Sequence, residues 1–318
     1  MQILTYILFI VGFVLLIKGA DYLVEGSSSI GKRLGLTPLF IGLTIVAFGT
    51  SAPELFVNIV ASFQGNAGIA VGNILGSNIA NILLILGTAA LITPLVVQTN
   101  TINKEIPLSF LAVVVLGVLV NDVFFDNAAH NILGRGDGFI LIAFFIIFMY
   151  YAAGMRRAES QEMSIKEYKK SISWLMIAGG LAGLGLGSKW IVDGATVIAQ
   201  QAGFSEALVG LSIIAIGTSL PELAASSVAA YKGKTDIAIG NVVGSNIFNI
   251  FWVLGLSSII RPIEFSPSLN FDILMVVVAT ILLLIFLYIG KRQVLQRREG
   301  YLFLILYLAY IAFLFYRG

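Results

Sequence analysis

The sequence predicts an all-α, polytopic membrane protein of ten transmembrane helices in two inverted five-helix repeats. Two observations lead to this prediction. First, 58% of the 318 residues are apolar and only 11% are charged, whereas soluble domains carry about 25% charged residues. Second, one motif occurs twice, as AFGTSAPEL at 47–55 and as AIGTSLPEL at 215–223, which is 168 residues later. Such internal duplication is typical of transporters that bind their substrate between two related halves.

Ten apolar stretches are long enough to cross a bilayer core, which takes about 20 residues of helix. They cover 2–26, 38–63, 69–93, 104–121, 137–155, 171–200, 206–231, 237–260, 271–290 and 299–316. Five fall in each half, and an odd number of spans per half turns the second half upside down relative to the first. We therefore expect a first repeat at 1–155, a linker at 156–170 and an inverted second repeat at 171–318.

The lysines and arginines divide unevenly between the two predicted sides of the membrane. Fourteen lie on one side and three on the other, while Lys18 and Lys189 lie within spans. Because positively charged loops stay in the cytoplasm, the basic side should be the cytoplasmic one. We expect an integral protein of the plasma or inner membrane, embedded in lipid, with both termini on the non-cytoplasmic side and the 156–170 linker in the cytoplasm.

The composition excludes several kinds of site. The chain has no cysteine and a single histidine, His130, which argues against zinc or copper sites built from nitrogen and sulfur ligands. A net charge of +2 gives no basis for binding nucleic acid. Any metal site must be made of oxygen atoms, and oxygen is the ligand of hard cations such as Ca²⁺. We expect no cofactor and no enzymatic activity.

The duplicated motif places Glu54 and Glu222 in otherwise apolar spans. An ionisable side chain is costly at that depth and usually marks a functional site. The register holds without a gap over 42–87 and 210–255. Pro53 and Pro221 each remove a backbone hydrogen bond, so both helices should kink just before the glutamate. The carbonyls freed by a kink need a partner within the membrane, and a bound cation can provide one.

Oxygen-bearing side chains surround each glutamate in the sequence. Thr50 lies four residues before Glu54, so the two should share a helical face where the helix persists. The next span carries a polar stripe of residues spaced by four, and the second repeat carries its twin. The candidate ligands are Glu54, Glu222, Thr50, Thr218, Ser51, Ser219, Asn73, Asn241, Ser77, Ser245, Asn81 and Asn249.

The charge of this set predicts the transport mode. Two carboxylates neutralise one Ca²⁺ or two Na⁺. An empty site would leave two anions close together in a low-dielectric region, where they repel each other. Loaded states can therefore cross the membrane while the empty state resists, which is the physical requirement for exchange.

The segments GTSAPEL…GNILGSNIANI and GTSLPEL…GNVVGSNIFNI resemble the α-repeats of the cation/calcium antiporter superfamily, in particular prokaryotic sodium/calcium exchangers. The resemblance covers the entire ten-span plan. It implies that spans 2, 3, 7 and 8 form the ion site and that spans 1 and 6 form a long tilted pair that slides across it. It also implies exchange of several Na⁺ for one Ca²⁺ by alternating access.

The resemblance implies roles for individual residues. Glu54 and Glu222 would be ligands shared by Ca²⁺ and Na⁺, and Asn81 and Asn249 would line the middle of the site. The remaining implied ligands are the hydroxyl or main-chain oxygens of Thr50 and Thr218, the hydroxyls of Ser77 and Ser245, and the main-chain carbonyls of Ala47 and Ala215. Some members, including the potassium-dependent exchangers, carry Asp at the position of Asn249, so asparagine here predicts transport without K⁺.

Other functions stay open at this point. A proton/calcium antiporter on the same scaffold is the main alternative, because two membrane carboxylates can also carry protons. A channel would gather repeats around one axis, whereas inverted repeats suit a two-faced carrier. Residues 134–137 contain the GxGD pattern of intramembrane aspartyl proteases, but no mid-span aspartate offers a partner for Asp137. Because both halves lie in one chain, we expect a monomer to function.

Overall fold

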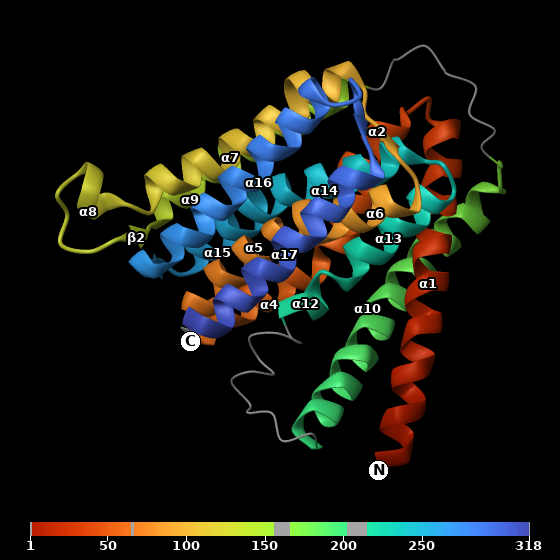
Figure 1. Cartoon of the computed structure of the whole chain (residues 1–318), viewed down its shortest axis with the longest axis horizontal. Helices are drawn as coiled ribbons and strands as arrows, with labels where there is room; N and C mark the ends of the chain where they lie inside the picture. The colour runs from red at the N-terminus through yellow and green to blue at the C-terminus, as the bar shows by residue number, and fades with distance from the viewer. Residues whose placement is uncertain (1, 65–66, 156–165, 202–214, 318) are drawn as a thin grey trace.

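The computed structural model describes residues 2–64, 67–155, 166–201 and 215–317. Figure 1 shows a compact bundle of helices with two long helices, α1 and α10, lying side by side on one flank. The elements of the first half are α1 (Gln2–Arg33), α2 (Pro38–Ile41), η1 (Gly42–Val46), α3 (Ala47–Thr50), α4 (Ala52–Gln64), α5 (Ala67–Ala80), η2 (Asn81–Leu86), α6 (Gly87–Ile92), β1 (Leu95–Val96), η3 (Thr101–Glu105), α7 (Ile106–Leu119), α8 (Asp122–Phe125), β2 (Ile132–Leu133) and α9 (Arg135–Gly154).

The second half follows the same order of helices. Its elements are α10 (Lys170–Gln201), α12 (Ala215–Thr218), α13 (Leu220–Tyr231), α14 (Thr235–Ile247), η5 (Phe248–Leu254), α15 (Gly255–Ile260), β3 (Ile263–Glu264), η6 (Pro267–Leu269), α16 (Asn270–Ile289), β4 (Val294–Leu295) and α17 (Arg297–Arg317). The π-helical segments η2 and η5 begin at Asn81 and Phe248, almost 168 residues apart. Wide π turns frequently accompany functional sites, and here they follow the polar stripe in both halves.

The helices bear out the prediction of a largely helical membrane protein. Within the described residues, eight helices are long and apolar enough to cross a membrane. The pair Pro38–Thr50 and Ala52–Phe63, bent by 44°, makes a ninth if it is counted as one span. The predicted span 206–231 lies partly outside the described residues, and α12 and α13 are its described part. The count of ten helices therefore stays a prediction.

The predicted kinks occur where the motif places them. The first helix breaks at Ser51 (φ −81°, ψ 4°), between α3 and α4. The second breaks at Ser219 (φ −86°, ψ 1°), between α12 and α13. Because proline lacks an N–H and crowds the preceding turn, Pro53 and Pro221 are tolerated in the first turn of α4 and α13 and cannot continue α3 and α12.

Helices α1 and α10 pack through glycines. A Cβ atom on Gly19 would lie 2.7 Å from the backbone nitrogen of Leu184, and one on Gly180 would lie 2.7 Å from that of Leu23. Small residues allow such close backbone approach between membrane helices. The glycines at 12, 19 and 26 recur at 180, 187 and 194, again 168 residues later. The duplication therefore extends to α1 and α10, beyond the region where the sequence motif is evident.

The fold also contains short strands that an all-α prediction omits. Strand β1 pairs with β4, and β2 pairs with β3, each over two residues. Each pairing joins a strand of the first half to one of the second. The loops at both ends of the bundle are thus tied together across the halves.

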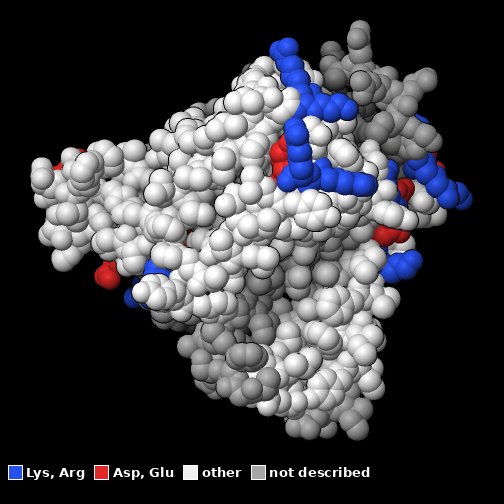
Figure 2. Space-filling view, in the orientation of Figure 1, with Lys and Arg blue, Asp and Glu red and all other residues white. Residues whose placement is uncertain are grey.

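The lysines and arginines concentrate at one end of the bundle, which we call the basic end (Figure 2). It includes Lys32 and Arg33 at the end of α1, Lys232 and Lys234 between α13 and α14, and the residues around the start of α17. The chain direction of three helices can be given relative to the basic end. Helices α1 and α13 run toward it and end there, whereas α4 runs away from it. The opposite end is sparsely charged.

A buried ion pair anchors the end of α17 to α16. Arg317 donates to Asp272 Oδ2 at 3.0 Å, and Tyr310 donates to Asp272 Oδ1 at 2.8 Å. The Asp272 side chain is only 4% exposed, so both of its oxygens are satisfied by these partners. Removing one partner would leave a buried carboxylate without compensation.

Arg317→Ala is therefore expected to lower the free energy of unfolding by about 1–3 kcal/mol, because it strips the Asp272 carboxylate of its counter-charge. Thermal unfolding in detergent micelles measures the loss. Asp272→Asn combined with Arg317→Ala should cost less than the sum of the two single changes, since the double variant leaves no unpaired charge. Additive losses would contradict this account.

Candidate ion-binding site

The two glutamates of the duplicated motif lie buried in the middle of the bundle. Glu54 is in the first turn of α4 and Glu222 in the first turn of α13, and their exposed fractions are 0% and 1%. Both helices begin directly after a break, so their N-terminal dipoles favour a nearby negative charge. The two carboxylates are also close enough to repel each other electrostatically. The two acids thus lie at equivalent positions of the two halves, each buried just after a helix break.

Hydroxyls from both halves hold the Glu222 carboxylate. Ser51 Oγ lies 3.1 Å from Glu222 Oε1 and 3.0 Å from Ser245 Oγ. Since Ser51 comes from the first half, the second-half carboxylate depends on the first half for its position.

The Glu54 carboxylate has a related arrangement. Ser77 of its own half donates to Glu54 Oε1 at 3.5 Å, and Ser219 Oγ of the second half lies 3.2 Å from Ser77 Oγ. Thr50 and Glu54 were expected to share a face where the helix persists, but the helix breaks at Ser51 between them. Each threonine instead donates to an asparagine of the opposite half.

Four asparagines clamp the crossing of α5 and α14. Asn81 donates to Asn246 Oδ1 at 2.9 Å, and Asn249 donates to Asn78 Oδ1 at 2.9 Å. Asn78 also donates to the carbonyl of Asn246 at 3.3 Å. Residues 78 and 246 were absent from the predicted site, although both belong to the repeated GSN triplet. The sequence feature that could have identified them is the recurrence of an asparagine within an apolar span.

Four acceptor oxygens of the predicted ligands are buried and have no hydrogen-bond partner. They are Glu54 Oε2, Glu222 Oε2, Asn81 Oδ1 and Asn249 Oδ1. The set is symmetric, with one carboxylate and one amide from each half. Leaving buried acceptors unsatisfied is costly, and a cation ligated by all four would remove that cost. The site thus has the donor set of a hard cation.

The outer parts of the two polar stripes contact the threonines. Thr50 donates to Asn241 Oδ1 at 3.1 Å, and Thr218 donates to Asn73 Oδ1 at 3.2 Å. The carbonyl of Ala47 accepts from Thr50 Oγ1 at 3.3 Å, and Ala215 begins α12 at the equivalent backbone position. The predicted ligands lie on α3, α4, α5 and η2 of the first half, on α12, α13, α14 and η5 of the second, and at the breaks Ser51 and Ser219. Only some of them touch a carboxylate.

The two halves differ in their exposure. Thr50 and Asn241 are fully buried, whereas their counterparts Thr218 and Asn73 are partly exposed. Asn241 donates to Ser226 Oγ at 2.9 Å. In the first half the corresponding atoms, Asn73 Nδ2 and Asn58 Oδ1, are both unpaired, because Asn58 donates to the carbonyl of Glu54 at 2.9 Å instead. The polar lining is closed toward the basic end and looser toward the opposite end.

The geometry can bind a cation but offers little for zinc or redox metals. In the part of the chain that the structure describes, no group of three or more His, Cys, Asp or Glu residues comes together. Neutral oxygens must therefore complete the coordination of any ion held by Glu54 and Glu222. A site of two charges and several neutral oxygens suits Ca²⁺ or Na⁺.

Comparison with known proteins agrees with this site. The family described as sodium/calcium exchanger protein matches residues 4–154 and 172–316. The chain belongs to the sodium/calcium exchanger family. Among its relatives, "Putative antiporter CaxA" of Alkalimonas amylolytica is 41% identical over 99% of both chains. "Sodium/calcium exchanger MaX1" of Methanosarcina acetivorans is 33% identical over 98% of this chain and 99% of its own.

Solved structures and further relatives extend this assignment. The structure of the sodium-calcium exchanger NCX_Mj matches with a TM-score of 0.84 and 33% identity, covering 99% of this chain and 100% of that one. "Inner membrane protein YrbG" of Escherichia coli is 40% identical over 84% of this chain and 83% of its own. "Ca(2+)/H(+) antiporter ChaA" of Bacillus subtilis is 26% identical over 88% and 84%. This chain is thus a member of a family of ion antiporters.

Proposed function

We propose that the protein exchanges Na⁺ for Ca²⁺ across the membrane by alternating access. The observation that carries the proposal is the symmetric set of unpaired acceptors, Glu54 Oε2, Glu222 Oε2, Asn81 Oδ1 and Asn249 Oδ1. In the proposed mechanism, these atoms ligate one Ca²⁺. The hydroxyls and carbonyls around Ala47, Thr50, Ser51, Asn73, Ser77 and their counterparts Ala215, Thr218, Ser219, Asn241 and Ser245 take part in the flanking Na⁺ positions.

Competition for the carboxylates couples the two ions. One Ca²⁺ or two Na⁺ neutralise Glu54 and Glu222, and either load removes the repulsion between the two acids. With neither load, the repelling carboxylates oppose closure of the site. Only sites occupied by an ion close readily, so the site changes sides only with an ion bound. The concentration gradient of one ion therefore drives transport of the other, and uncoupled leak of either ion is suppressed.

The proposal includes the membrane arrangement predicted from the sequence. The protein has ten transmembrane helices in two inverted repeats, 1–155 and 171–318, joined by a cytoplasmic linker at 156–170. The basic end is cytoplasmic, and both termini lie on the other side. The site lies between the two repeats, as in other inverted-repeat transporters. One chain forms a complete site and works as a monomer.

Transport is expected to proceed without K⁺, because Asn249 supplies a neutral oxygen where an acid would favour a further monovalent cation. Sodium-loaded proteoliposomes diluted into Na⁺-free buffer should take up ⁴⁵Ca²⁺ at equal rates with K⁺ or choline as the balancing cation. Asn249→Asp is the matched variant, and its uptake should become sensitive to K⁺. Uptake by the unmodified protein that stops in choline would contradict this prediction.

Exchange of H⁺ for Ca²⁺ is the second candidate. The relationship to the antiporter ChaA and the two buried carboxylates both favour it, since each carboxylate can carry a proton. The same vesicles discriminate between the candidates. Sodium exchange predicts ⁴⁵Ca²⁺ uptake driven by a Na⁺ gradient at constant pH, whereas uptake that needs a pH gradient and ignores Na⁺ would establish proton coupling.

A further inference from the structure

Four charged side chains at the basic end join α1 to the loop between α13 and α14. Glu25 Oε1 accepts from Lys232 Nζ at 2.9 Å and from Lys234 Nζ at 2.8 Å. Lys232 also pairs with Asp21. We call these four residues the ion-pair cluster. The side chains of Lys234 and Glu25 are only 11% and 15% exposed, so solvent and salt screen this pair less than a surface pair.

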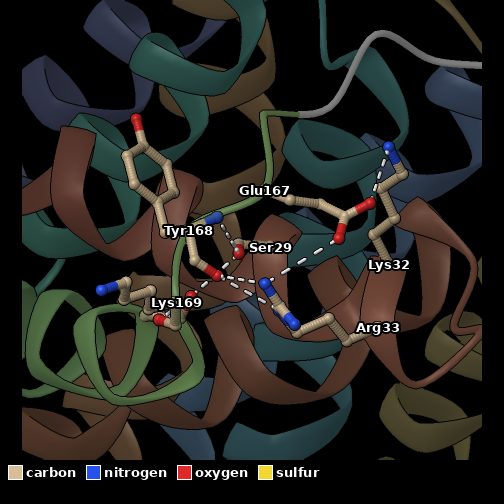
Figure 3. Close-up of polar contacts among 7 residues, drawn as sticks. Ser29, Lys32, Arg33, Glu167, Tyr168 and Lys169 are labelled. Atoms are coloured by element: carbon tan, nitrogen blue, oxygen red, sulfur yellow. Dashed lines mark hydrogen bonds and ion pairs between the residues drawn. The ribbon is translucent and has the colours of Figure 1, made fainter.

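The ion-pair cluster connects the α1–α10 pair to the helix that carries Glu222. Helix α13 starts beside the ion site and ends just before Lys232, about 15 Å away at the usual rise per residue. Helix α1 is itself fastened to the start of α10, as Figure 3 shows: Arg33 donates to the carbonyl of Tyr168 at 2.6 Å, and Lys32 pairs with Glu167 at 3.1 Å. The ion-pair cluster therefore attaches the α1–α10 pair, as a unit, to the end of α13.

The same end of the molecule is closed around the site. A Cβ atom on Gly240 would lie 2.8 Å from the carbonyl of Leu39, and one on Gly244 would lie 2.6 Å from that of Leu43. The segment that the duplication places opposite Gly72 and Gly76, 206–214, lies outside the described residues. The ion-pair cluster thus accompanies the tightly packed basic-end route, where Thr50 and Asn241 are fully buried, whereas their counterparts Thr218 and Asn73 are partly exposed.

The sequence provides this cluster at one end only. Subtracting or adding 168 gives the counterpart positions, which hold Gln64 and Asn66 for the two lysines and Lys189 and Asp193 for the two acids. Among the described residues, neither Lys189 nor Asp193 forms an ion pair. The two ends are related by the duplication, yet only the basic end carries complementary charges. The difference is therefore built into the sequence.

We propose that the ion-pair cluster is a latch that holds the basic-end route closed and makes the resting protein open toward the opposite end. This inference deepens the proposed function, because both routes lead to the same ion site. Opening the basic-end route requires the α1–α10 pair to move relative to α13, which separates Glu25 and Asp21 from the lysines. Each charge lost from the cluster should therefore shift the resting population toward the state open at the basic end.

The chain has no cysteine, so a single reporter thiol can measure this shift. Ser226→Cys places the thiol on α13 one turn from Glu222, toward the basic end, at a position that is buried in this structure. Membrane-impermeant maleimide, applied to vesicles whose basic end faces outward, should label it slowly. Glu25→Gln and Lys234→Gln should each raise the labelling rate by about fivefold to tenfold, as expected when a partly buried ion pair is removed.

A double-mutant cycle and a counterpart control test the pairing itself. Glu25→Gln combined with Lys234→Gln should label no faster than the faster single variant, since the same contact is lost in each. Asp193→Asn, the matched change on α10, should leave the rate unchanged. Unchanged labelling in both single variants, additive effects in the double variant, or equal acceleration by Asp193→Asn would overturn the latch. Labelling needs no ion flux, so a latch that responds as expected in a protein without Na⁺/Ca²⁺ exchange would refute only the proposed function.

Discussion

Glu54→Gln is expected to reduce Na⁺-driven Ca²⁺ uptake by at least about a hundredfold, because ligand charge tunes Ca²⁺ affinity over several decades. The amide has nearly the size of the carboxylate and can still accept from Ser77, so the packing around α4 is retained. The loss is therefore one of charge: the remaining carboxylate balances only half of the charge on Ca²⁺. Glu222→Gln should have an effect of similar size, since its surroundings are the mirrored ones.

Two measurements separate this effect from misfolding. Ca²⁺ should raise the thermal unfolding temperature of the unmodified protein and fail to raise that of either variant. Glu105→Gln is the matched control, because Glu105 is also fully buried but bonds to Tyr151 away from the site. It should keep Ca²⁺ stabilisation and exchange. Normal uptake by Glu54→Gln would refute the assignment of the central site.

Gly19→Val and Gly180→Val should each abolish most transport, because both glycines lie where α1 and α10 touch backbone to backbone. The added Cβ would lie 2.7 Å from a backbone nitrogen of the facing helix in either case. Backbone atoms cannot yield as a flexible side chain can, so the two helices must separate. We expect the free energy of unfolding to fall by about 1–3 kcal/mol or more, which is typical of overpacking. We also expect that α1 and α10 no longer move as one unit.

Gly179→Val provides the control for the same chemical change on the same helix. No heavy atom of the described chain lies within 4 Å of a Cβ at Gly179, so this variant should unfold and transport like the unmodified protein. ⁴⁵Ca²⁺ uptake and thermal unfolding in detergent measure both effects. A Gly180→Val protein that transports normally would show that the close backbone contact between α1 and α10 is not needed for transport.

The sequence alone predicted the parts of the structure that depend on periodicity and duplication. The apolar spans, the breaks before Glu54 and Glu222, and the burial of the two acids all followed from the repeat and from proline chemistry. The spacing of four among Gly179, Gly183 and Gly187 predicts one packing face; Gly183 and Gly187 do contact α1, but Gly180 takes the place of Gly179. A helical face can be assigned only when the facing helix is known, and that information is absent from a local pattern.

The partners of individual site residues were the least predictable part. Thr50 was placed with Glu54 because they lie four residues apart, yet the helix breaks between them and Thr50 donates to Asn241. Asn78 and Asn246 were missed because their role arises only where α5 crosses α14. Asp21 and Glu25 pair with lysines from a loop more than 200 residues away along the chain. Such contacts depend on the tertiary arrangement.

The reciprocal bonding of the asparagines bears on how such a protein can evolve. Asn81 and Asn249 each bond to an amide in the other copy of the motif, and Glu222 accepts from Ser51 of the other copy. Neither copy can assemble its share of the cage alone. An ancestral single unit would have needed a second molecule in the opposite orientation, and fusion made that pairing permanent while freeing the outer positions, such as 25 and 193, to diverge.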